Sequence, residues 1–531
     1  MSYTTMGFLF FVAALFIVYY IMPSKLRWIV LLIGNVIFYV ASGWDNFVFL
    51  LASILISYFV GVKMSNLQDE FKDIKKSGTY DRQELKDIKA GYTKRRRRYL
   101  QAGLVGVIGI LVVVKYTNFL LGNVHSLLDA LGFANERITV KMIIPLGISF
   151  YTFQTIAYLV DVYNGMTAQK NIFKYALYSS FFPSVVQGPI PRYSELGTQL
   201  FEEHKFNGSN VVDGLTLILW GLVKKLVLAE KLALFVSEIY DNYASYDGVI
   251  LVLATVLYSI QIYADFAGCM DIVTGVARLF DIRLKPNFIR PYFSKTMPEF
   301  WRRWHASLGT WFKDYVFYPF SISNVSLKLN KNARKTFGNA AGRIIAASMP
   351  ILIVWALTGI WHGAEWKYVI WGLFHGTLII LSTIFTPSNE KLADKLKINR
   401  NNFLFQLFQM GRTFALCCVG RVFFRADNFG HAIGVFRQMF AKTGVWRLLD
   451  GRIYTYGLDK RSWFIVGMAM LAILIVSILE ERKKADNIAD VTSDKPAIIR
   501  GAVLYVLLFA VVVFASYGKG YDPADFIYEQ F

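Results

Sequence analysis

Long apolar runs alternate with short basic segments along almost the whole chain. They cover residues 5–22, 28–42, 46–63, 99–120, 140–163, 247–280, 344–360, 366–387, 402–423, 463–480 and 498–517. Most of these runs have the length that a helix needs to cross a hydrocarbon core of about 30 Å. The pattern predicts an all-α polytopic membrane protein with about eleven spans of about 20 residues each.

Three stretches do not fit a simple span. Residues 178–196 are broken by three prolines, and irregular backbone at membrane depth is tolerated only where protein or a water-filled cavity surrounds it. Residues 285–300, also rich in proline, are predicted to form a loop or a re-entrant piece. In 210–240 charged residues interrupt the apolar pattern, which favours an interfacial or strongly tilted helix.

The basic residues lie between the apolar runs. The net charge is +20, and clusters of basic residues occur in 64–98, 321–343, 388–401 and 481–495, which the positive-inside rule places in the cytoplasm. We therefore expect no nucleic-acid binding. Residues 64–98 are predicted to be a solvated hydrophilic loop, and the C-terminal tail, 518–531, is predicted to lie outside.

Cysteine usage adds little chemistry. Only three cysteines occur, Cys269, Cys417 and Cys418, all in apolar surroundings. They form neither a disulfide framework nor a set of metal ligands, so we expect them to pack in the interior. We predict no metal site and no tightly bound cofactor.

The candidate chemistry gathers in residues 299–376. This stretch holds three of the six histidines, His305, His362 and His375, in the motifs WRRWH, TGIWHG and WGLFHG. A single histidine on an apolar helix is more often a hydrogen-bonded core residue than a site. Three within 71 residues, in aromatic settings, favour a functional site at membrane depth.

Polar residues in and beside the spans have a structural alternative. Asp265 and Asp271 are six residues apart and do not share a helical face, which argues against a paired acid and base. Hydrogen bonds or ion pairs with nearby arginines are the better interpretation. Salt bridges and interface anchoring are favoured for Arg302, Arg303 and Asp314.

Seven motifs, in one order along most of the chain, resemble bacterial members of the membrane-bound O-acyltransferase (MBOAT) family. The resemblance is to the branch that O-acetylates alginate and transfers D-alanine to teichoic acids. The motifs are PLGISFYTFQTIAYLVDVYNG (145–165), FFPSVVQGPIPRY (181–193), QIYADFAGCMDIVTGVARLF (261–280), PNFIRPY (286–292), FWRRWHASLGTWFKDYVFYP (300–319), TGIWHGAEWKYVIWGLFHG (358–376) and RVFFRAD (421–427).

The resemblance implies a ring of tilted helices, with re-entrant and interfacial helices, around a central tunnel in a bacterial cell (inner) membrane. It implies one acyltransferase domain over 1–531 with its catalytic core at 299–376. An acyl group, most often acetyl, would pass from a cytoplasmic thioester, acyl-CoA or an acyl carrier, to a hydroxyl at the outer face. An extracytoplasmic partner of the SGNH type, or another glycan-handling protein, is expected to complete the transfer.

The resemblance also assigns roles. His362 matches the catalytic histidine, and a neutral imidazole can take a hydroxyl proton near pH 7. His305 matches the second signature histidine, which either donates to the acyl carbonyl or locks the helices. Supporting roles are expected for His375, Trp361, Trp304, Asp265, Gln261, Asn287 and Asp314.

The tail carries a separate hypothesis. DFIYEQF (525–531) resembles the C-terminal motif of the small partner in D-alanyl transfer, in which a tyrosine is thought to carry the acyl group. Tyr528 would then be a nucleophile activated by His362, with a covalent acyl intermediate. The alternative is an ordinary aromatic terminus at the membrane interface.

Other classes of function stay open at this point. A transporter also uses broken helices, but the two halves of the chain show no paired repeat. A non-catalytic scaffold for an outer acetyltransferase would tolerate the loss of His362. Within the enzyme class, acylation of a lipid or a protein is the alternative.

Overall fold

The computed structural model describes residues 2–133, 136–142, 144–441 and 444–516. These residues are helical apart from turns and one isolated β-bridge between Phe288 and Trp304. The chain divides into two compact units, Met1–Asn207 with Ala277–Leu284, and Gly208–Val276 with Lys285–Phe531. The predicted all-α membrane class is confirmed, whereas the single domain over 1–531 stays a prediction.

Nine of the described helices are long and apolar enough to cross a membrane, where the sequence predicts about eleven. The two that differ are α1 (Met6–Ile21) and α6 (Ile148–Tyr163), which have 16 residues each. At 1.5 Å per residue such a helix extends about 24 Å, less than a hydrocarbon core of about 30 Å.

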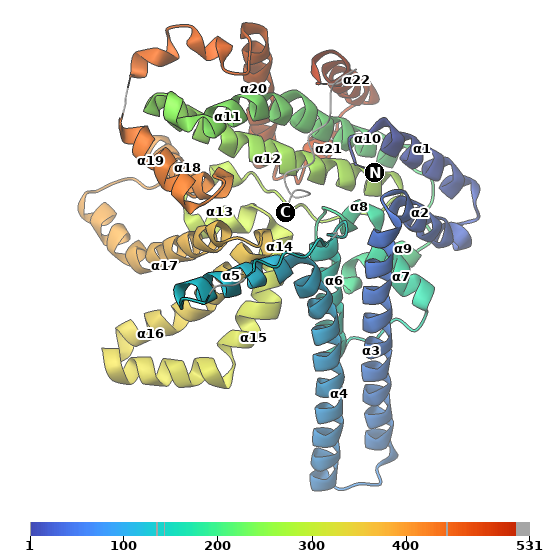
Figure 1. The fold of residues 1–531 in the computed structure, drawn as a ribbon. Coiled ribbons are helices and arrows are strands. Elements are labelled where there is room, and N and C mark those ends of the chain that lie inside the picture. The colour runs from blue at the N-terminus through green and yellow to red at the C-terminus, as the bar shows by residue number, and fades with distance from the viewer. Residues whose placement is uncertain (1, 134–135, 143, 442–443, 517–531) are drawn as a thin grey trace. The chain divides into compact units, whose positions relative to one another are not determined.

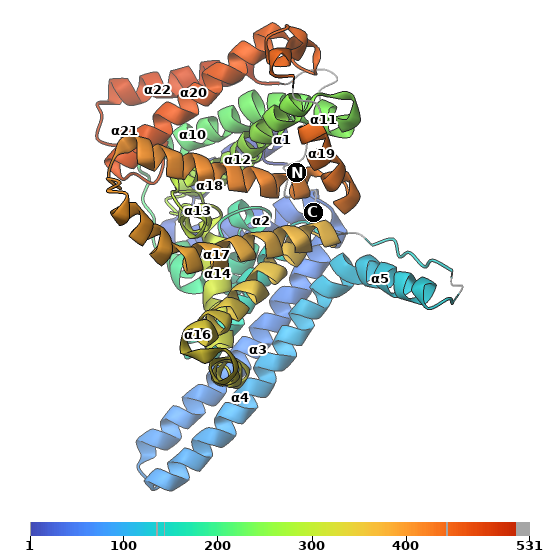
Figure 2. The same cartoon turned by 90° about the vertical axis from the view of Figure 1, so that its left-hand side faces the viewer.

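The first unit is built on α2 (Arg27–Ala41), α3 (Trp44–Ser77) and α4 (Arg82–Leu111). The predicted loop at 64–98 is wrong, because α3 and α4 continue through it as a helical hairpin whose turn is residues 78–81 (Figures 1 and 2). Gly78 takes a left-handed φ of 67°, and Asp81 with Glu84 forms a capping box at the start of α4. The segment is polar because its helices are exposed.

Beyond α4 a π-helical turn, Val112–Tyr116, leads into α5 (Thr117–Ala130). The proline-rich stretch 178–196 is broken as predicted: it holds the end of α7 (Ile172–Ser180), α8 (Phe182–Val185) and most of a π-helical turn (Tyr193–Gly197) that leads into α9 (Thr198–Phe201). Residues 181–189 are buried inside the unit. Buried irregular backbone is therefore surrounded by protein, as membrane depth requires.

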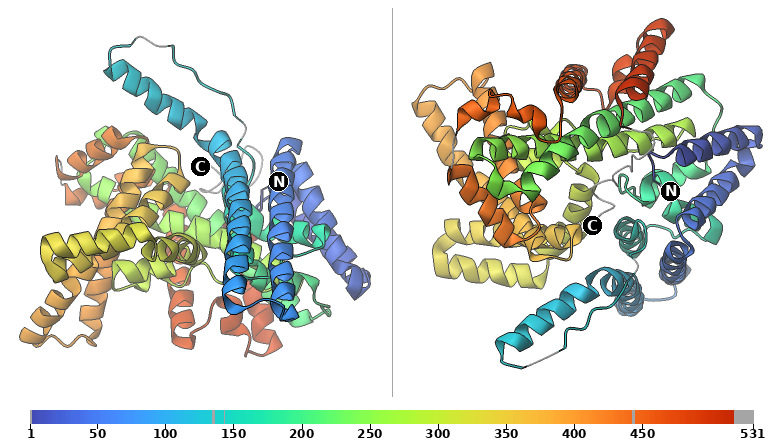
Figure 3. Two further views of the ribbon diagram at one scale, coloured as in Figure 1. Left: turned by 90° about the horizontal axis from the view of Figure 1, so that it is seen from below. Right: turned by 45° about the horizontal axis from the view of Figure 1, so that its top comes forward.

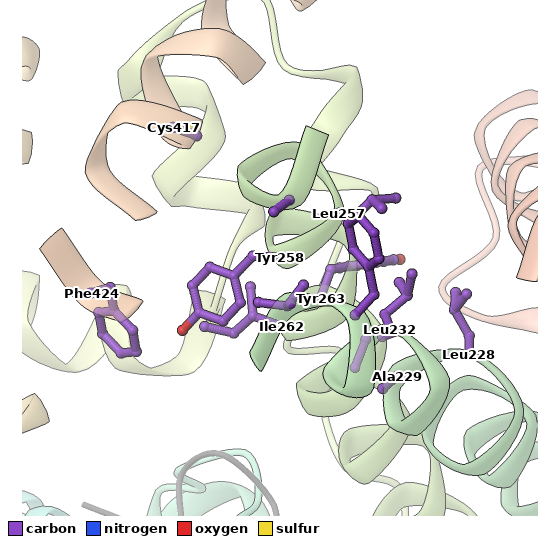
Figure 4. Close-up of a cluster of buried hydrophobic side chains, with 14 of the residues drawn as sticks. Leu228, Ala229, Leu232, Leu257, Tyr258, Ile262, Tyr263, Cys417 and Phe424 are labelled. Atoms are coloured by element: carbon purple, nitrogen blue, oxygen red, sulfur yellow. The ribbon is translucent and has the colours of Figure 1, made fainter. Parts of the chain in front are cut away.

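The second unit begins with α10 (Gly208–Leu222), a π-helical segment (Val223–Ala229) and α11 (Glu230–Asp241), packed against α12 (Gly248–Leu279). The interfacial or strongly tilted orientation of 210–240 stays a prediction, but three of the charged residues that suggested it do not face the surface. Lys224, Lys225 and Glu230 are buried. Lys224 pairs with Asp271 of α12, and Lys225 pairs with Asp265 of α12 and with Glu230. The ion pairs of the two aspartates are therefore with lysines, where the sequence predicts arginines. Figure 4 shows the apolar cluster around Tyr258, Ile262 and Tyr263 of α12, which Leu228 and Leu232 approach.

Short helices follow, α13 (Met297–Arg303), α14 (Ala306–Phe312), a π-helical turn (Lys313–Phe317) and α15 (Tyr318–Ser321). The long pair α16 (Asn324–His362) and α17 (Trp366–Lys395) comes next. Most of the basic segment 321–343 is helix, interrupted at Gly338, where φ is 79°. The first half of the basic segment 388–401 is likewise the end of α17.

A seam of glycines brings α16 and α17 together. A Cβ at Gly359 would overlap the Tyr368 carbonyl, and one at Gly372 would overlap the Trp355 carbonyl. Only glycine allows this close approach, which sets the histidine at the end of α16 beside the early turns of α17.

The second unit ends with α18 (Phe403–Arg425), α19 (Phe429–Ala441), α20 (Lys460–Lys483), α21 (Ile488–Thr492) and α22 (Ala497–Phe514). Helices α20 and α22 pack against the π-helical segment between α10 and α11, and Figure 3 shows both beside these helices. The amide of Ser516 donates to the Leu226 carbonyl at 3.2 Å, which ties the end of α22 to that segment.

Candidate active site

The second unit has an open cavity of about 560 Å³ between α13, α14, the π-helical turn after α14, α16 and α17. This volume lies in the range of ligand pockets. Two of the three predicted histidines, His305 and His362, line the same cavity. Its other walls are mostly apolar and include Trp301, Trp304, Leu308, Phe312, Phe317, Ile351, Val354, Trp355 and Ile379.

His305 is held by a short pairing of residues 287–289 with 303–306. The Ile289 amide donates to the Arg303 carbonyl, and the Ala306 amide donates to the Asn287 carbonyl, both at 2.9 Å. His305 takes a left-handed conformation, φ 49° and ψ 52°. Such a conformation costs a non-glycine residue about 1–3 kcal/mol and is common at functional sites.

The Asn287 side chain defines the tautomer of His305. Asn287 Oδ1 accepts from the Ser307 amide at 3.0 Å and from Ser307 Oγ at 2.9 Å, and it lies 3.1 Å from His305 Nδ1. An oxygen that only accepts requires the imidazole hydrogen on Nδ1, so Nε2 keeps its lone pair. Burial lowers the pKa of the His305 imidazole to about 3, so the ring is neutral near pH 7.

His362 is the last residue of α16 and is 4 % exposed. The ring centroids of Trp361 and Trp371 each lie 4.8 Å from its own, and that of Phe424 lies at 5.5 Å. A Cβ at Gly363 would overlap the Tyr368 ring. The glycine of the Trp-His-Gly motif therefore lets the chain turn tightly and leaves His362 in an aromatic enclosure.

His375, on α17, is 2 % exposed and does not line the cavity. Its ring lies among Trp301 at 4.8 Å, Trp371 at 5.0 Å and Trp355 at 5.7 Å. Trp371 thus contacts both His362 and His375. His375 lies behind the cavity wall, and its supporting role stays a prediction.

The two predicted tryptophans differ in position. Trp361 packs against His362 and also against His305, whose ring centroid lies at 5.9 Å, and so connects the two histidines. Trp304 lines the cavity itself, and the guanidinium of Arg421 lies 4.4 Å from its ring centroid.

The remaining predicted residues lie away from the cavity. Asp265 pairs with Lys225 at 2.6 Å, and Asp314 and Gln261 are half-buried without lining it. Tyr528 lies outside the described residues. No sequence pattern singled out four residues in and around the site, namely Trp301, Trp355, Trp371 and Arg421. Their one sequence signal is that they fall inside or beside the matched motifs.

Arg302 and Lys313 bring the only formal positive charges among the residues that line the cavity. Both are exposed. The cavity therefore combines an apolar interior, two imidazoles and a cationic edge, which suits a ligand with an acyl or alkyl part and an anionic group.

Residues 168–419 match the family model described as MBOAT, membrane-bound O-acyltransferase family. The chain is 28% identical to the probable alginate O-acetylase AlgI of Pseudomonas syringae pv. tomato, over 94% of this chain and 86% of that protein. It is 27% identical to the peptidoglycan O-acetyltransferase of Helicobacter pylori, over 79% and 74%. It is 29% identical to the teichoic acid D-alanyltransferase of Bacillus subtilis, over 54% and 70%.

Proposed function

Because this chain contains a domain of the membrane-bound O-acyltransferase family, we propose that it moves an acetyl group from a cytoplasmic thioester to a hydroxyl of an extracytoplasmic polysaccharide. The chain is an O-acyltransferase, as its family and its named relatives are. It is a multi-pass protein of the bacterial cell membrane. The observation that supports the proposal most is the pair His305 and His362 on one apolar cavity.

In the proposed step His362 is the general base. Its imidazole takes the proton of the acceptor hydroxyl while the oxygen forms a bond to the thioester carbonyl carbon, and the carbonyl electron pair moves to oxygen. The tetrahedral intermediate then collapses, the carbon–sulfur bond breaks, and the thiolate takes the proton back from the imidazolium. The products are an ester and a free thiol, so His362 returns to its neutral form.

His305 fits the locking role better than the donor role. With its hydrogen on Nδ1 facing Asn287, the neutral ring offers only an acceptor at Nε2 and cannot donate to an acyl carbonyl from that atom. His305 would instead keep α13, α14 and the loop at 287–289 in register around the cavity.

The donor is proposed to be an anionic thioester, acyl-CoA or the phosphopantetheine arm of an acyl carrier. Arg302 and Lys313 would meet its phosphate, and the apolar walls would take the acyl end. Lys313 is followed closely in sequence by the basic segment 321–343, which the positive-inside rule assigns to the cytoplasm. The donor would therefore enter from within.

The passage of the acetyl group to an outer partner is inferred from the family resemblance alone. An outer SGNH-type or glycan-handling partner would receive the acetyl group, with Tyr528 as the relay. Retention of full transfer by Tyr528→Phe would remove the relay but leave the base chemistry intact. An acyl adduct on the tail, seen by intact-mass measurement, would support the relay.

The test is complementation of a deletion strain, with ester-linked acetate on envelope polysaccharide measured by mass spectrometry. Wild type and His431→Ala should restore the esters, because His431 lies on α19 and does not line the cavity. His362→Ala, expressed at the same level, should restore none. Full restoration by His362→Ala would favour the scaffold alternative. If the deletion strain loses esters from a lipid or a protein and not from polysaccharide, the acceptor belongs to that class instead.

A further inference from the structure

Arg421 is a buried arginine of α18 that no carboxylate compensates in the described part of the chain. It is 3 % exposed, and its Nη2 atom has no hydrogen-bond partner there. Other arginines of the same unit do pair with acids. Arg290 meets Glu481 at 2.6 Å, Arg425 meets Asp241 at 2.9 Å and Arg500 meets Asp213 at 2.6 Å.

The surroundings of Arg421 connect it to the candidate active site. Its Cζ lies 4.4 Å from the ring centroid of Trp304, which lines the cavity with His305 and His362. The preceding residue, Gly420, abuts His375 so closely that a Cβ there would overlap the imidazole. Arg421 is therefore separated from the cavity by one indole ring.

A charge in this place is unfavourable for folding. An arginine within a span and without a counter-ion loses more hydration than a cation–π contact with one indole returns. An apolar side chain of similar length would fill the same space at lower cost, as replacements of buried charges often do. The retained guanidinium points to a use of its charge.

We propose that Arg421 is a positioning residue of the acyl-transfer reaction, which holds Trp304 in the cavity wall and gives that wall a fixed positive charge. In the step described above, negative charge builds on the thioester carbonyl oxygen when the hydroxyl attacks. A fixed cation in a low-dielectric surrounding stabilises that charge without reorganising. Arg421 itself exchanges no proton and forms no bond. The inference rests on the proposed function.

The test compares Arg421→Lys and Arg421→Met with wild type in lipid nanodiscs. The donor is acetyl-CoA, the acceptor is polysaccharide isolated from the deletion strain, and thiol release gives kcat and KM. If charge matters, the Lys variant keeps about a tenth of kcat, the Met variant loses about 100-fold, and the KM for acetyl-CoA changes less than threefold. Thermal unfolding of the Met variant should not fall below wild type.

Arg425→Met is the matched control, since Arg425 lies one turn further along α18 and has the Asp241 partner, and it should keep wild-type kcat. If Arg421 only fills space, kcat of Arg421→Met should be near that of wild type and kcat of Arg421→Lys should be no higher, and that result would overturn the inference.

If Arg421→Met does not fold, Trp304→Phe is the variant to measure, because it weakens the stacking while residue 421 stays charged. A tenfold loss of kcat there supports the inference and an unchanged kcat refutes it. Absence of thiol release by wild type would instead refute the proposed function.

Discussion

The Asn287 side chain offers the sharpest test of how the site is built. Its Oδ1 accepts from the Ser307 amide and hydroxyl and meets His305 Nδ1, all within 3.1 Å, in a buried position. Asn287→Ala removes all three contacts. It also releases the constraint that keeps His305 in its left-handed conformation.

The size of the effect follows from these contacts. A hydrogen bond contributes about 0.5–1.5 kcal/mol net, so three give about 1.5–4.5 kcal/mol, and the relaxed backbone of His305 returns part of this. We expect a loss of about 2–3 kcal/mol in unfolding free energy. Because a displacement of about 1 Å in an active site can cost about 100-fold in rate, kcat should fall by about that factor.

The assay combines thermal unfolding in nanodiscs with thiol release from acetyl-CoA. Asn401→Ala, at an exposed position of the loop before α18, is the control and should match wild type in both. Asn287→Asp keeps the acceptor for Nδ1, so it should keep more activity than Asn287→Ala. If Asn287→Ala unfolds and turns over like Asn401→Ala, Asn287 does not position His305.

Three further predictions concern charges of the second unit. Lys225→Met removes the cation that faces the buried carboxylates of Asp265 and Glu230 and should cost about 3–5 kcal/mol by denaturation, whereas the variant that also carries Asp265→Leu and Glu230→Leu should recover most of the loss; equal losses in both would contradict the pairing. The folded pKa of His305 lies below its unfolded value of about 6.5, so the unfolded state binds the extra proton and stability falls with acid. Between pH 6.5 and 5 the wild type should lose about 2 kcal/mol of unfolding free energy, and the His305→Gln variant should not show this loss. Equal acid sensitivity of the two proteins would refute a buried neutral ring at His305. Arg302→Glu with Lys313→Glu should raise the KM for acetyl-CoA at least tenfold with kcat little changed, and an unaltered KM would exclude this edge as the phosphate site.

The sequence predicted the helices better than their ends. Apolar runs fixed the class and most spans, because length and hydropathy are local properties. The charge of segment 64–98 predicts a loop, yet a helix without an apolar face is stable when it continues from a span. Polarity reports exposure, and it does not distinguish an exposed helix from a loop.

The charges at 224 and 225 show the opposite difficulty. Interruption of an apolar pattern by lysines predicted an interfacial helix, but a π-helical segment turns both side chains toward α12, where Asp271 and Asp265 compensate them. The register of a π-helix and the identity of a partner 40 residues away depend on the tertiary structure. A local sequence pattern therefore does not predict them.

The site was predictable to the extent that motifs marked it. His305 and His362 came from the motifs and line one cavity, and Asn287 contacts His305. The tryptophans around His375 and the cation behind Trp304 come from four helices, α13, α16, α17 and α18, and lie between residues 301 and 421 of the chain. Only packing brings them together, so residue types alone could not distinguish them from the chain's other aromatic residues.

In the proposed reaction, the aromatic residues around His362 would favour attack on the thioester by an alcohol over attack by water. A base that activates a hydroxyl also activates water, and water is far more concentrated. His362 is 4 % exposed, with Trp361, Trp371 and Phe424 against its ring. A substrate hydroxyl delivered to that ring displaces the little water that fits, whereas an opened wall admits more. Trp371→Ala should therefore raise the ratio of acetyl-CoA hydrolysis to transfer, measured as thiol release against ester formed, and an unchanged ratio would show that the indoles do not exclude water.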